Sequence, residues 1–342
     1  MKLLILTFGD RQSASTRYRV LNFLPLLKRD FNSLNIVYYT GLTRPFKQLH
    51  KLVYILRALL ASRKTDSILV QKILLPTWLL RFLKSQKATL TFDFDDSIWL
   101  GAPDQTSGSS SRKNAENKFQ ATLRTADRII SGNEFLAEHA RQYSKRVTVI
   151  PSVVDIKRYV ISPKKESNRI CIGWIGSAVN YPYLKDLESV FKRLSEKYGQ
   201  RLFLKIISNG NFHLNVGLEC QNISWSEAGE INEMKQFDIG LMPLKDTEWS
   251  RGKCSFKAIQ YMALGIVPVV SPVGANKLVV TNNQDGLWAV SDTEWVDAIS
   301  YLIENPEKRR QMGVAARSKI HKNYTLETAY PLLKQVLTET LL

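Results

Sequence analysis

Three cations surround the predicted start of one helix in the second half of the chain. Arg251, Lys253 and Lys257 flank Ser255, a residue type that often caps a helix N-terminus. The helix dipole already places partial positive charge at this end, so the cations repel it unless an anion is bound. Lysine side chains and the N–H groups of a first helical turn together bind phosphate well. The spacing therefore predicts a phosphate or diphosphate site.

Gln260 lies one turn beyond Lys257 on the same predicted helix. Its amide offers a donor and an acceptor, which suits a pair of hydroxyl groups. The alternative is a surface helix whose apolar side faces the core and whose cations are simply solvated. The concentration of positive charge at the helix start favours the anion site.

Three aspartates follow one another in the segment TFDFDDSIW, at the predicted end of a strand. Asp93 and Asp95 form a D-x-D pair, which can hold a divalent cation against a diphosphate. A lone carboxylate pair is an incomplete ligand set, so we expect no metal here. Asp95 and Asp96 are candidates for catalysis and Asp93 for substrate contact. Equally, these carboxylates could satisfy local backbone N–H groups, and both interpretations stay open.

Two further loops follow predicted strands and complete the set of candidates. A glycine directly after a strand lets the backbone approach a phosphate or a sugar. The second loop lacks the G-x-G-x-x-G fingerprint, which argues against a dinucleotide. The candidates are Gly9, Asp10 and Arg17 in the first half of the chain, and Gly176, Ser177 and Asn180 in the second.

The elements that must position these residues alternate between strand and helix along the whole chain. Such alternation predicts an α/β protein with doubly wound parallel sheets. We expect two Rossmann-like domains, residues 1–162 and 163–325, with a last helix over 326–342 that packs back on the first. The polar segment 107–114 is expected to be a loop and the charged segment 162–169 a linker. Parallel sheets bind ligands at the carboxyl ends of their strands, so we expect the site in the cleft facing both domains.

The positive charge of the chain is concentrated in its first half. The net charge is +17, and residues 1–168 hold 28 Lys and Arg against 13 Asp and Glu. Residues 46–61 and 77–87 combine this charge with apolar stripes, which predicts contact with an anionic membrane surface. The alternative is that the stripes belong to the core and the cations are solvated. No segment approaches the roughly 18 apolar residues of a transmembrane helix.

The three cysteines are Cys171, Cys220 and Cys254, an odd number without a C-x-x-C pair. This pattern is typical of a reducing compartment and indicates neither a disulfide framework nor a zinc site. No interleaved basic and aromatic motif indicates nucleic-acid binding.

The segment FDIGLMPLKDTEWSRGKCSFKAIQYMALGIVPVVSPVGAN, residues 237–276, resembles the donor-binding half of retaining GT-B glycosyltransferases of family 4, also called glycosyl transferases group 1. TFDFDDSIW, ASTRYR and WIGSAVNYPYL resemble further segments of that family. The resemblance implies a nucleoside-diphosphate sugar donor, of UDP or GDP type, on the second domain and an acceptor on the first, without a cofactor. Arg251 and Lys253 would stabilise the leaving diphosphate. The implied donor-binding residues are Gly176, Ser177, Asn180, Glu248, Ser255, Lys257, Gln260, Gly274 and Asn276.

One departure from the family pattern falls at this site. The family often carries two glutamates eight residues apart, where this chain has Gly252 and Gln260. Gln260 can still bind a ribose hydroxyl, and Asp246 and Glu248 lie just upstream as candidates to supply a carboxylate.

The function expected from the resemblance is transfer of a hexosyl or N-acetylhexosaminyl group, with retention, to a saccharide or lipid-linked acceptor. The setting would be bacterial-type surface polysaccharide or glycolipid synthesis, at the cytoplasmic face of a membrane. Two alternatives stay open: a nucleotide-sugar epimerase of the same fold, and a non-catalytic, basic, membrane-associated subunit.

Overall fold

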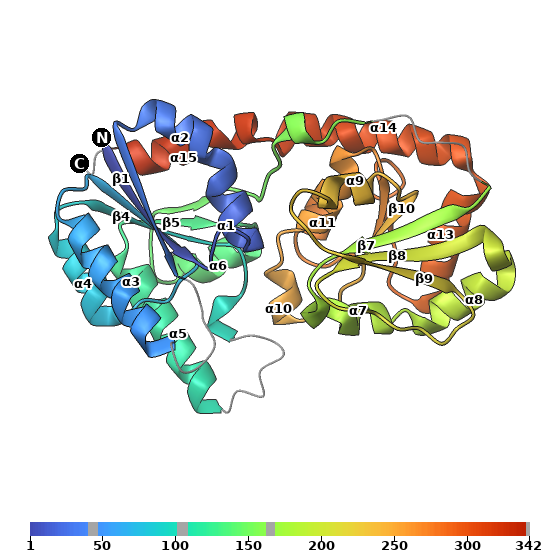
Figure 1. Ribbon diagram of the computed structural model, residues 1–342, viewed down its shortest axis with the longest axis horizontal. Coiled ribbons are helices and arrows are strands. Elements are labelled where there is room, and N and C mark those ends of the chain that lie inside the picture. The colour runs from blue at the N-terminus through green and yellow to red at the C-terminus, as the bar shows by residue number, and fades with distance from the viewer. Residues whose placement is uncertain (40–46, 101–108, 162–167, 340–342) are drawn as a thin grey trace. The chain divides into compact units, whose positions relative to one another are not determined.

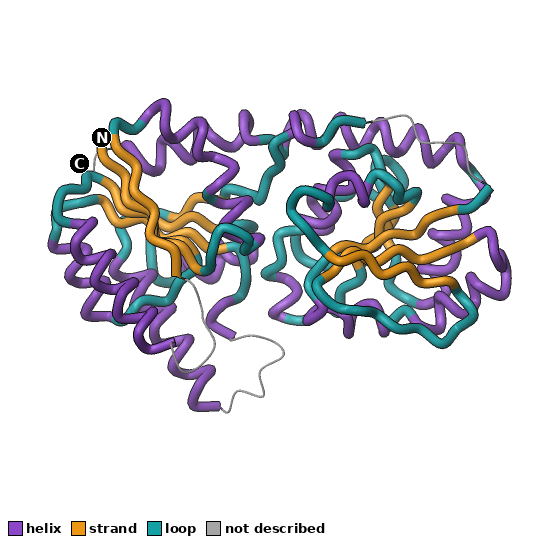
Figure 2. The backbone as a smooth tube through the Cα atoms, viewed as in Figure 1, coloured by secondary structure: helices purple, strands orange, loops and turns teal. Residues whose placement is uncertain are grey.

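The computed structural model describes residues 1–39, 47–100, 109–161 and 168–339 (Figure 1). The chain divides into two compact units. The first unit contains Met1–Val153, Arg251–Cys254 and Leu326–Leu342, and the second contains Val154–Ser250 and Ser255–Thr325. Each unit is built around one six-stranded, wholly parallel sheet with helices packed against it (Figure 2). The predicted fold class, two Rossmann-like doubly wound domains, is confirmed.

The sheet of the first unit has the strand order β2-β1-β3-β4-β5-β6. Its central strands are buried on both faces, as the continuous apolar run of β1 predicts. The last helix, α15, belongs to this unit, where the hydroxyl of Tyr330 donates to the carboxylate of Asp30 over 2.6 Å. The strands are β1 (Lys2–Phe8), β2 (Ser33–Tyr39), β3 (Ser67–Gln71), β4 (Thr89–Phe94), β5 (Arg128–Ser131) and β6 (Val147–Val149). The helices are α1 (Ala14–Arg19), α2 (Leu24–Asp30), α3 (Lys47–Ser62), α4 (Thr77–Ser85), α5 (Ser109–Thr125), α6 (Glu134–Arg141) and α15 (Leu326–Thr338).

The sheet of the second unit has the order β9-β8-β7-β10-β11-β12, which is the order 3-2-1-4-5-6 when its strands are counted from β7. Two clusters of buried apolar side chains form its core. One cluster includes Phe191 and Trp295, and the other includes Tyr261 and Ile320. The strands are β7 (Ile170–Ile175), β8 (Leu202–Ser208), β9 (Glu219–Ser224), β10 (Ile239–Met242), β11 (Val267–Val270) and β12 (Leu287–Trp288). The helices are α7 (Tyr181–Lys185), α8 (Glu188–Tyr198), α9 (Glu230–Met234), α10 (Glu248–Arg251), α11 (Phe256–Ala263), α12 (Asn276–Val279), α13 (Asp292–Glu304) and α14 (Pro306–Asn323).

Some local predictions were wrong. The segment 107–114 was expected to be a polar loop, but residues 109–114 form the first turns of α5, and residues 107–108 lie outside the described residues. The strands β9 and β12 were not predicted. β9 is a polar edge strand of sequence ECQNIS, and β12 has only two residues, so neither shows a clear apolar pattern. Residues 162–167 of the expected linker lie outside the described residues.

Candidate functional site

The strand order of the second unit places a topological switch point between β7 and β10. Ligands of open α/β sheets bind beyond the carboxyl ends of the strands at such a point. β7 and β10 are paired only through Ile172 with Ile239 and Gly173 with Gly240. The loop after β7 carries Gly176 and the loop after β10 leads to α10 and α11, so the topology gathers the predicted donor-binding segments there.

Tyr261 of α11 fills the space where β7 and β10 separate. Its hydroxyl accepts from the backbone N–H of Ile175, 3.1 Å away, and donates to the carbonyl of Leu241, 3.3 Å away. A Cβ on Gly240 would lie 2.4 Å from the tyrosine ring, so only glycine allows this approach. Tyr261 therefore ties α11 to the carboxyl ends of both strands. The sequence analysis missed this residue, because a tyrosine on an apolar helix face carries no distinctive signal.

Lys257 lies in the first turn of α11 and folds over the loop after β7. Its ammonium nitrogen is 5.5 Å from the ring centroid of Trp174. A Cβ on Gly176 would lie 2.8 Å from Lys257 Cε and 2.6 Å from the tryptophan ring, so this position also requires glycine. Two predicted residues, Gly176 and Lys257, are thus brought together. Ser177 is exposed in the same loop, and Asn180 lies in the short turn that follows it.

Ser255 is the N-cap residue of α11, as predicted, but its side chain makes no capping hydrogen bond. Ser255 has a left-handed backbone, with φ of 55°, and no side chain caps the helix. Its hydroxyl instead donates to Asn276 Oδ1 over 2.7 Å, and Asn276 Nδ2 donates to the carbonyl of Ser271 over 2.8 Å. Both side chains are buried and hold the loop after β11, which contains Gly274, against the start of α11. Donor binding by Ser255 and Asn276 stays a prediction.

Gln260 and Glu248 occupy contrasting environments. Gln260 is 4% exposed, and its amide nitrogen donates to the hydroxyl of Tyr159 over 3.1 Å. Glu248 is exposed at the first residue of α10. Ribose binding by Gln260 and donor binding by Glu248 remain predictions. Arg251, exposed, and Lys253, half-buried, lie in the segment that belongs to the first unit.

The first unit has its own switch point, between β1 and β3, and Lys72 directly follows β3 there. Lys72 has a φ of 58°, unusual for a residue with a side chain. Its ammonium nitrogen lies 2.9 Å from both Asp95 Oδ1 and Ser15 Oγ, and it also pairs with Asp96. The sequence analysis counted Lys72 only among the basic residues. The sequence did contain one signal for Lys72 as a site residue, because it is a cation that directly follows a predicted buried strand.

This ion cluster determines the protonation of Asp95. Burial acts to raise the pKa of the carboxyl group, but the neighbouring Lys72 and Arg19 outweigh burial and lower it below the ordinary value of 3.8. For Lys72, burial acts to lower the pKa of the ammonium group. The negative charges of Asp95 and Asp96 have the larger effect, so the pKa of Lys72 is raised. A carboxylate with a lowered pKa is a weak base. The cluster therefore suits binding of substrate hydroxyl groups better than proton abstraction by Asp95.

Two predicted acceptor-side residues are buried instead of open to a substrate. Asp93, 3% exposed, pairs through both carboxylate oxygens with Arg19, whose Nη1 also donates to the carbonyl of Ile150 over 2.6 Å. Arg17 is 2% exposed and donates to the hydroxyl of Tyr18 over 2.7 Å. For Asp93 this is a structural role, but its partner is the guanidinium of Arg19 and not the local backbone N–H groups of the alternative interpretation. Direct contact of either residue with an acceptor stays a prediction.

Gly9 and Asp10 build the loop after β1. Gly9 has a φ of 97°, and a Cβ there would lie 2.3 Å from Ser13 Oγ. Asp10 Oδ1 accepts from the backbone N–H groups of Gln12 and Ser13, each over 3.0 Å. These contacts stabilise the turn into α1, which carries Ser15 toward Lys72.

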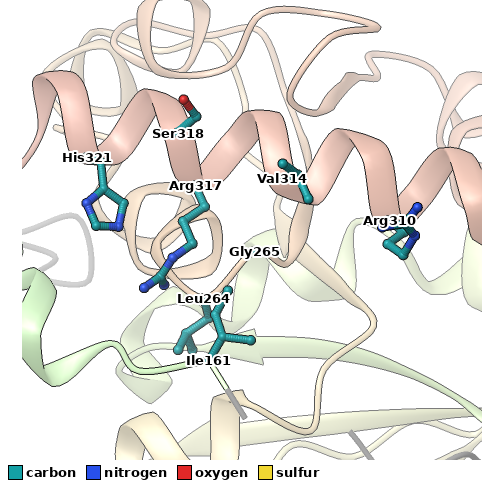
Figure 3. A pocket seen from close by; sticks show the side chains of 9 residues that line it. Ile161, Leu264, Gly265, Arg310, Val314, Arg317, Ser318 and His321 are labelled. Carbon is teal, nitrogen blue, oxygen red and sulfur yellow. The ribbon is translucent and has the colours of Figure 1, made fainter. Parts of the chain in front are cut away.

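Within the described ranges, no group of three or more His, Cys, Asp or Glu side chains is arranged to hold a metal ion. A groove of about 410 Å³ lies on the second unit between α14 and the turn after α11 (Figure 3). Leu264, Val314 and Arg317 line it, and no predicted site residue does. Gly265, also in its lining, precedes β11, so the groove lies at the amino ends of the strands, away from the switch point.

Comparison with known proteins adds a family and a fold. Residues 156–319 match the family model described as "Glycosyl transferases group 1". No curated protein matches the chain significantly by sequence. The structure resembles sucrose-phosphate synthase from Thermosynechococcus elongatus, with a TM-score of 0.76 and 14% identity over 98% of each chain. It also resembles Anabaena Alr3699/HepE in complex with UDP, with a TM-score of 0.72 and 13% identity over 99% of this chain and 100% of that one. A third likeness is to the lipopolysaccharide outer core galactosyltransferase WaaB in its apo form, with a TM-score of 0.68 and 11% identity over 100% of both chains. At these identities the likenesses establish the fold alone.

Proposed function

We propose that this protein transfers a sugar from a nucleoside-diphosphate sugar. Its residues 156–319 match the glycosyl transferases group 1 model, in agreement with the predicted resemblance. The observation that carries the proposal is the placement of Lys257. Lys257 lies in the first turn of α11 and over Gly176, just after β7, inside the matched residues. A cation, a helix start and a glycine loop at a switch point together suit a diphosphate.

We propose that the diphosphate binds Lys257 and the first turn of α11, with the loop containing Gly176 and Ser177 beside it. Lys253 and Arg251 would stabilise the negative charge that develops on the diphosphate as the sugar leaves. The nucleotide is of UDP or GDP type, and UDP is the first to test because a protein of the same fold is known in complex with UDP.

The transfer is proposed to retain the anomeric configuration, as in the family 4 enzymes that the sequence resembles. The transferred group is a hexosyl or N-acetylhexosaminyl group, and the acceptor is a saccharide or a lipid-linked saccharide. The cluster of Lys72, Asp95 and Asp96 supports an acceptor rich in hydroxyl groups, because carboxylates accept hydrogen bonds from hydroxyl groups.

Thermal-shift and calorimetric titration with UDP, GDP and their sugars tests the donor assignment. One nucleotide class should bind, and incubation of its sugar with candidate acceptors should release the free nucleoside diphosphate. NMR of the product would show whether the anomeric configuration is retained. Conversion of the donor sugar without an acceptor would favour the epimerase, and the absence of both binding and turnover would favour the non-catalytic subunit.

A second part of the proposal concerns a membrane surface, and α3 supports it. Tyr54 and Ala58 on α3 face the core. Further apolar side chains point outward, among them Leu52 at 54% exposed, Leu56 at 49% and Leu60 at 67%. Lys51, Arg57 and Arg63 are exposed on or next to the same helix. An apolar face edged by cations suits the interface of an anionic membrane, and the protein would then act as a peripheral enzyme on the cytoplasmic side.

Vesicle pelleting tests this surface directly. Among the described residues, no helix has the length and apolar character needed to span a bilayer. Leu56→Glu with Leu60→Glu should weaken binding to vesicles that contain phosphatidylserine. Leu278→Glu is the matched control, because Leu278 is 65% exposed on α12 of the second unit. Equal pelleting of all variants would contradict the membrane proposal.

A further inference from the structure

Four residues, Arg251–Cys254, belong to the first unit although their neighbours on both sides along the chain belong to the second. They pack on two turns that follow adjacent strands. One turn, after β4, contains Asp95 and Ser97, and the other, after β5, contains Gly132 and Asn133. We call Arg251–Cys254 the segment, and we call Asp95, Ser97, Gly132 and Asn133, on which it packs, the seat.

Asn133 holds the segment through hydrogen bonds to its backbone. Its Nδ2 donates to the carbonyl of Arg251 over 3.2 Å and to the carbonyl of Lys253 over 3.1 Å. Its Oδ1 accepts from the N–H of Leu136 over 2.9 Å, which caps α6. The cap fixes the orientation of the amide, so its N–H groups point at the segment. Serine can replace the capping oxygen, but it has no amide to donate.

Two glycines allow the segment and the seat to approach closely. A Cβ on Gly132 would lie 2.3 Å from Cys254 Sγ, and a Cβ on Gly252 would lie 2.2 Å from Ser97 Oγ. The Cys254 thiol donates to the carbonyl of Asp95 over 3.2 Å. Cys254 is 8% exposed, and burial raises the pKa of its thiol well above the ordinary value, so it stays protonated and able to donate.

We propose that the seat orients the segment and that Asn133 is a positioning residue for Lys253. This rests on the proposed function, in which Lys253 stabilises the leaving diphosphate. Because the Lys253 carbonyl is held, the backbone from which its side chain extends is placed before the donor binds. A charged group placed in advance stabilises a developing charge without reorganisation during the reaction.

The seat itself is tested by labelling Cys254 with N-ethylmaleimide, without any substrate. Asn133→Ser keeps the α6 cap but removes both amide donors. Loss of two hydrogen bonds should raise the labelling rate of Cys254 about tenfold, measured by peptide mass spectrometry. Cys171, which is 1% exposed in the second unit, should label at the wild-type rate and serves as the internal control. An unchanged labelling rate at Cys254 would show that Asn133 does not hold the Arg251–Cys254 segment in place.

Positioning through Lys253 is tested by a double-mutant cycle on turnover. Asn133→Ser should lower kcat about tenfold in the wild-type background and less than about twofold in the Lys253→Ala background. An equal loss in both backgrounds would show that Asn133 does not act through Lys253. Normal turnover of Lys253→Ala would overturn the proposed diphosphate role together with the positioning, and Cys254 labelling would still decide whether the seat exists.

Discussion

Gly252 provides the sharpest test of how the Arg251–Cys254 segment packs. The resembled family often carries glutamate at this position, so the sequence alone suggests that Gly252→Glu would restore a missing group. In the structure a Cβ at this position would lie 2.2 Å from Ser97 Oγ and 2.9 Å from the Ser97 backbone nitrogen. Any side chain there must push the segment off its seat, so we expect loss of stability and of activity.

The size of the effect follows from these distances. Carbon and a second heavy atom pack best at about 3.5–4 Å, so Gly252→Ala requires a displacement of more than about 1 Å. Overpacking of this kind costs about 1–3 kcal/mol. A domain of this size loses about 2–4 °C in Tm for each kcal/mol, so the expected decrease is about 2–12 °C. Gly252→Glu should cost at least as much.

The assay is thermal and urea unfolding of Gly252→Ala, Ser97→Gly and the double variant. Ser97→Gly removes the two side-chain atoms at 2.2 and 3.1 Å but leaves the backbone nitrogen at 2.9 Å. The double variant should therefore recover a substantial part of the loss, seen as a favourable coupling energy. A Gly252→Ala protein with wild-type Tm and turnover would refute the reasoning.

Three further predictions test the ion pairs and the candidate donor site. Asp93→Ala leaves the buried Arg19 without its carboxylate, and it should cost about 3–5 kcal/mol in urea unfolding; a loss below about 1 kcal/mol would contradict a buried ion pair. Because the folded pKa of Asp95 is lowered, its contribution to stability is present above about pH 4 and is lost as the pH falls through that folded pKa. Lys72→Met should therefore move the midpoint of acid unfolding, followed by circular dichroism, to higher pH, and an unmoved midpoint would argue against the cluster. Lys257→Ala should weaken calorimetric binding of the preferred nucleoside diphosphate at least about tenfold, whereas Lys277→Ala, an exposed lysine on α12, should not; equal affinities would exclude Lys257 from the site.

Much of the fold could be predicted because its signals are local. The buried run of β1 and the alternation of strand and helix repeat along the chain, and parallel sheets follow from that pattern. Where the local pattern is weak, as in the polar strand β9, the prediction failed. Serines that begin α5 were interpreted as a loop for the same reason.

For the candidate site too, some features could be predicted from the sequence and others depend on the tertiary structure. The cations around the start of α11 and the glycine loop after β7 are close in sequence to the elements that present them, so the sequence by itself determined these candidates. The tertiary structure decided which side chains are available: it buries Asp93 against Arg19, binds Asn276 to Ser255, and gathers Asp95 and Asp96 around Lys72. Asn133 and Lys253 are 120 residues apart in the chain, yet one hydrogen bond joins them. Periodicity shows which face of an element is apolar, but contacts between distant segments depend on how the sheet orders its strands, and no local pattern contains that order.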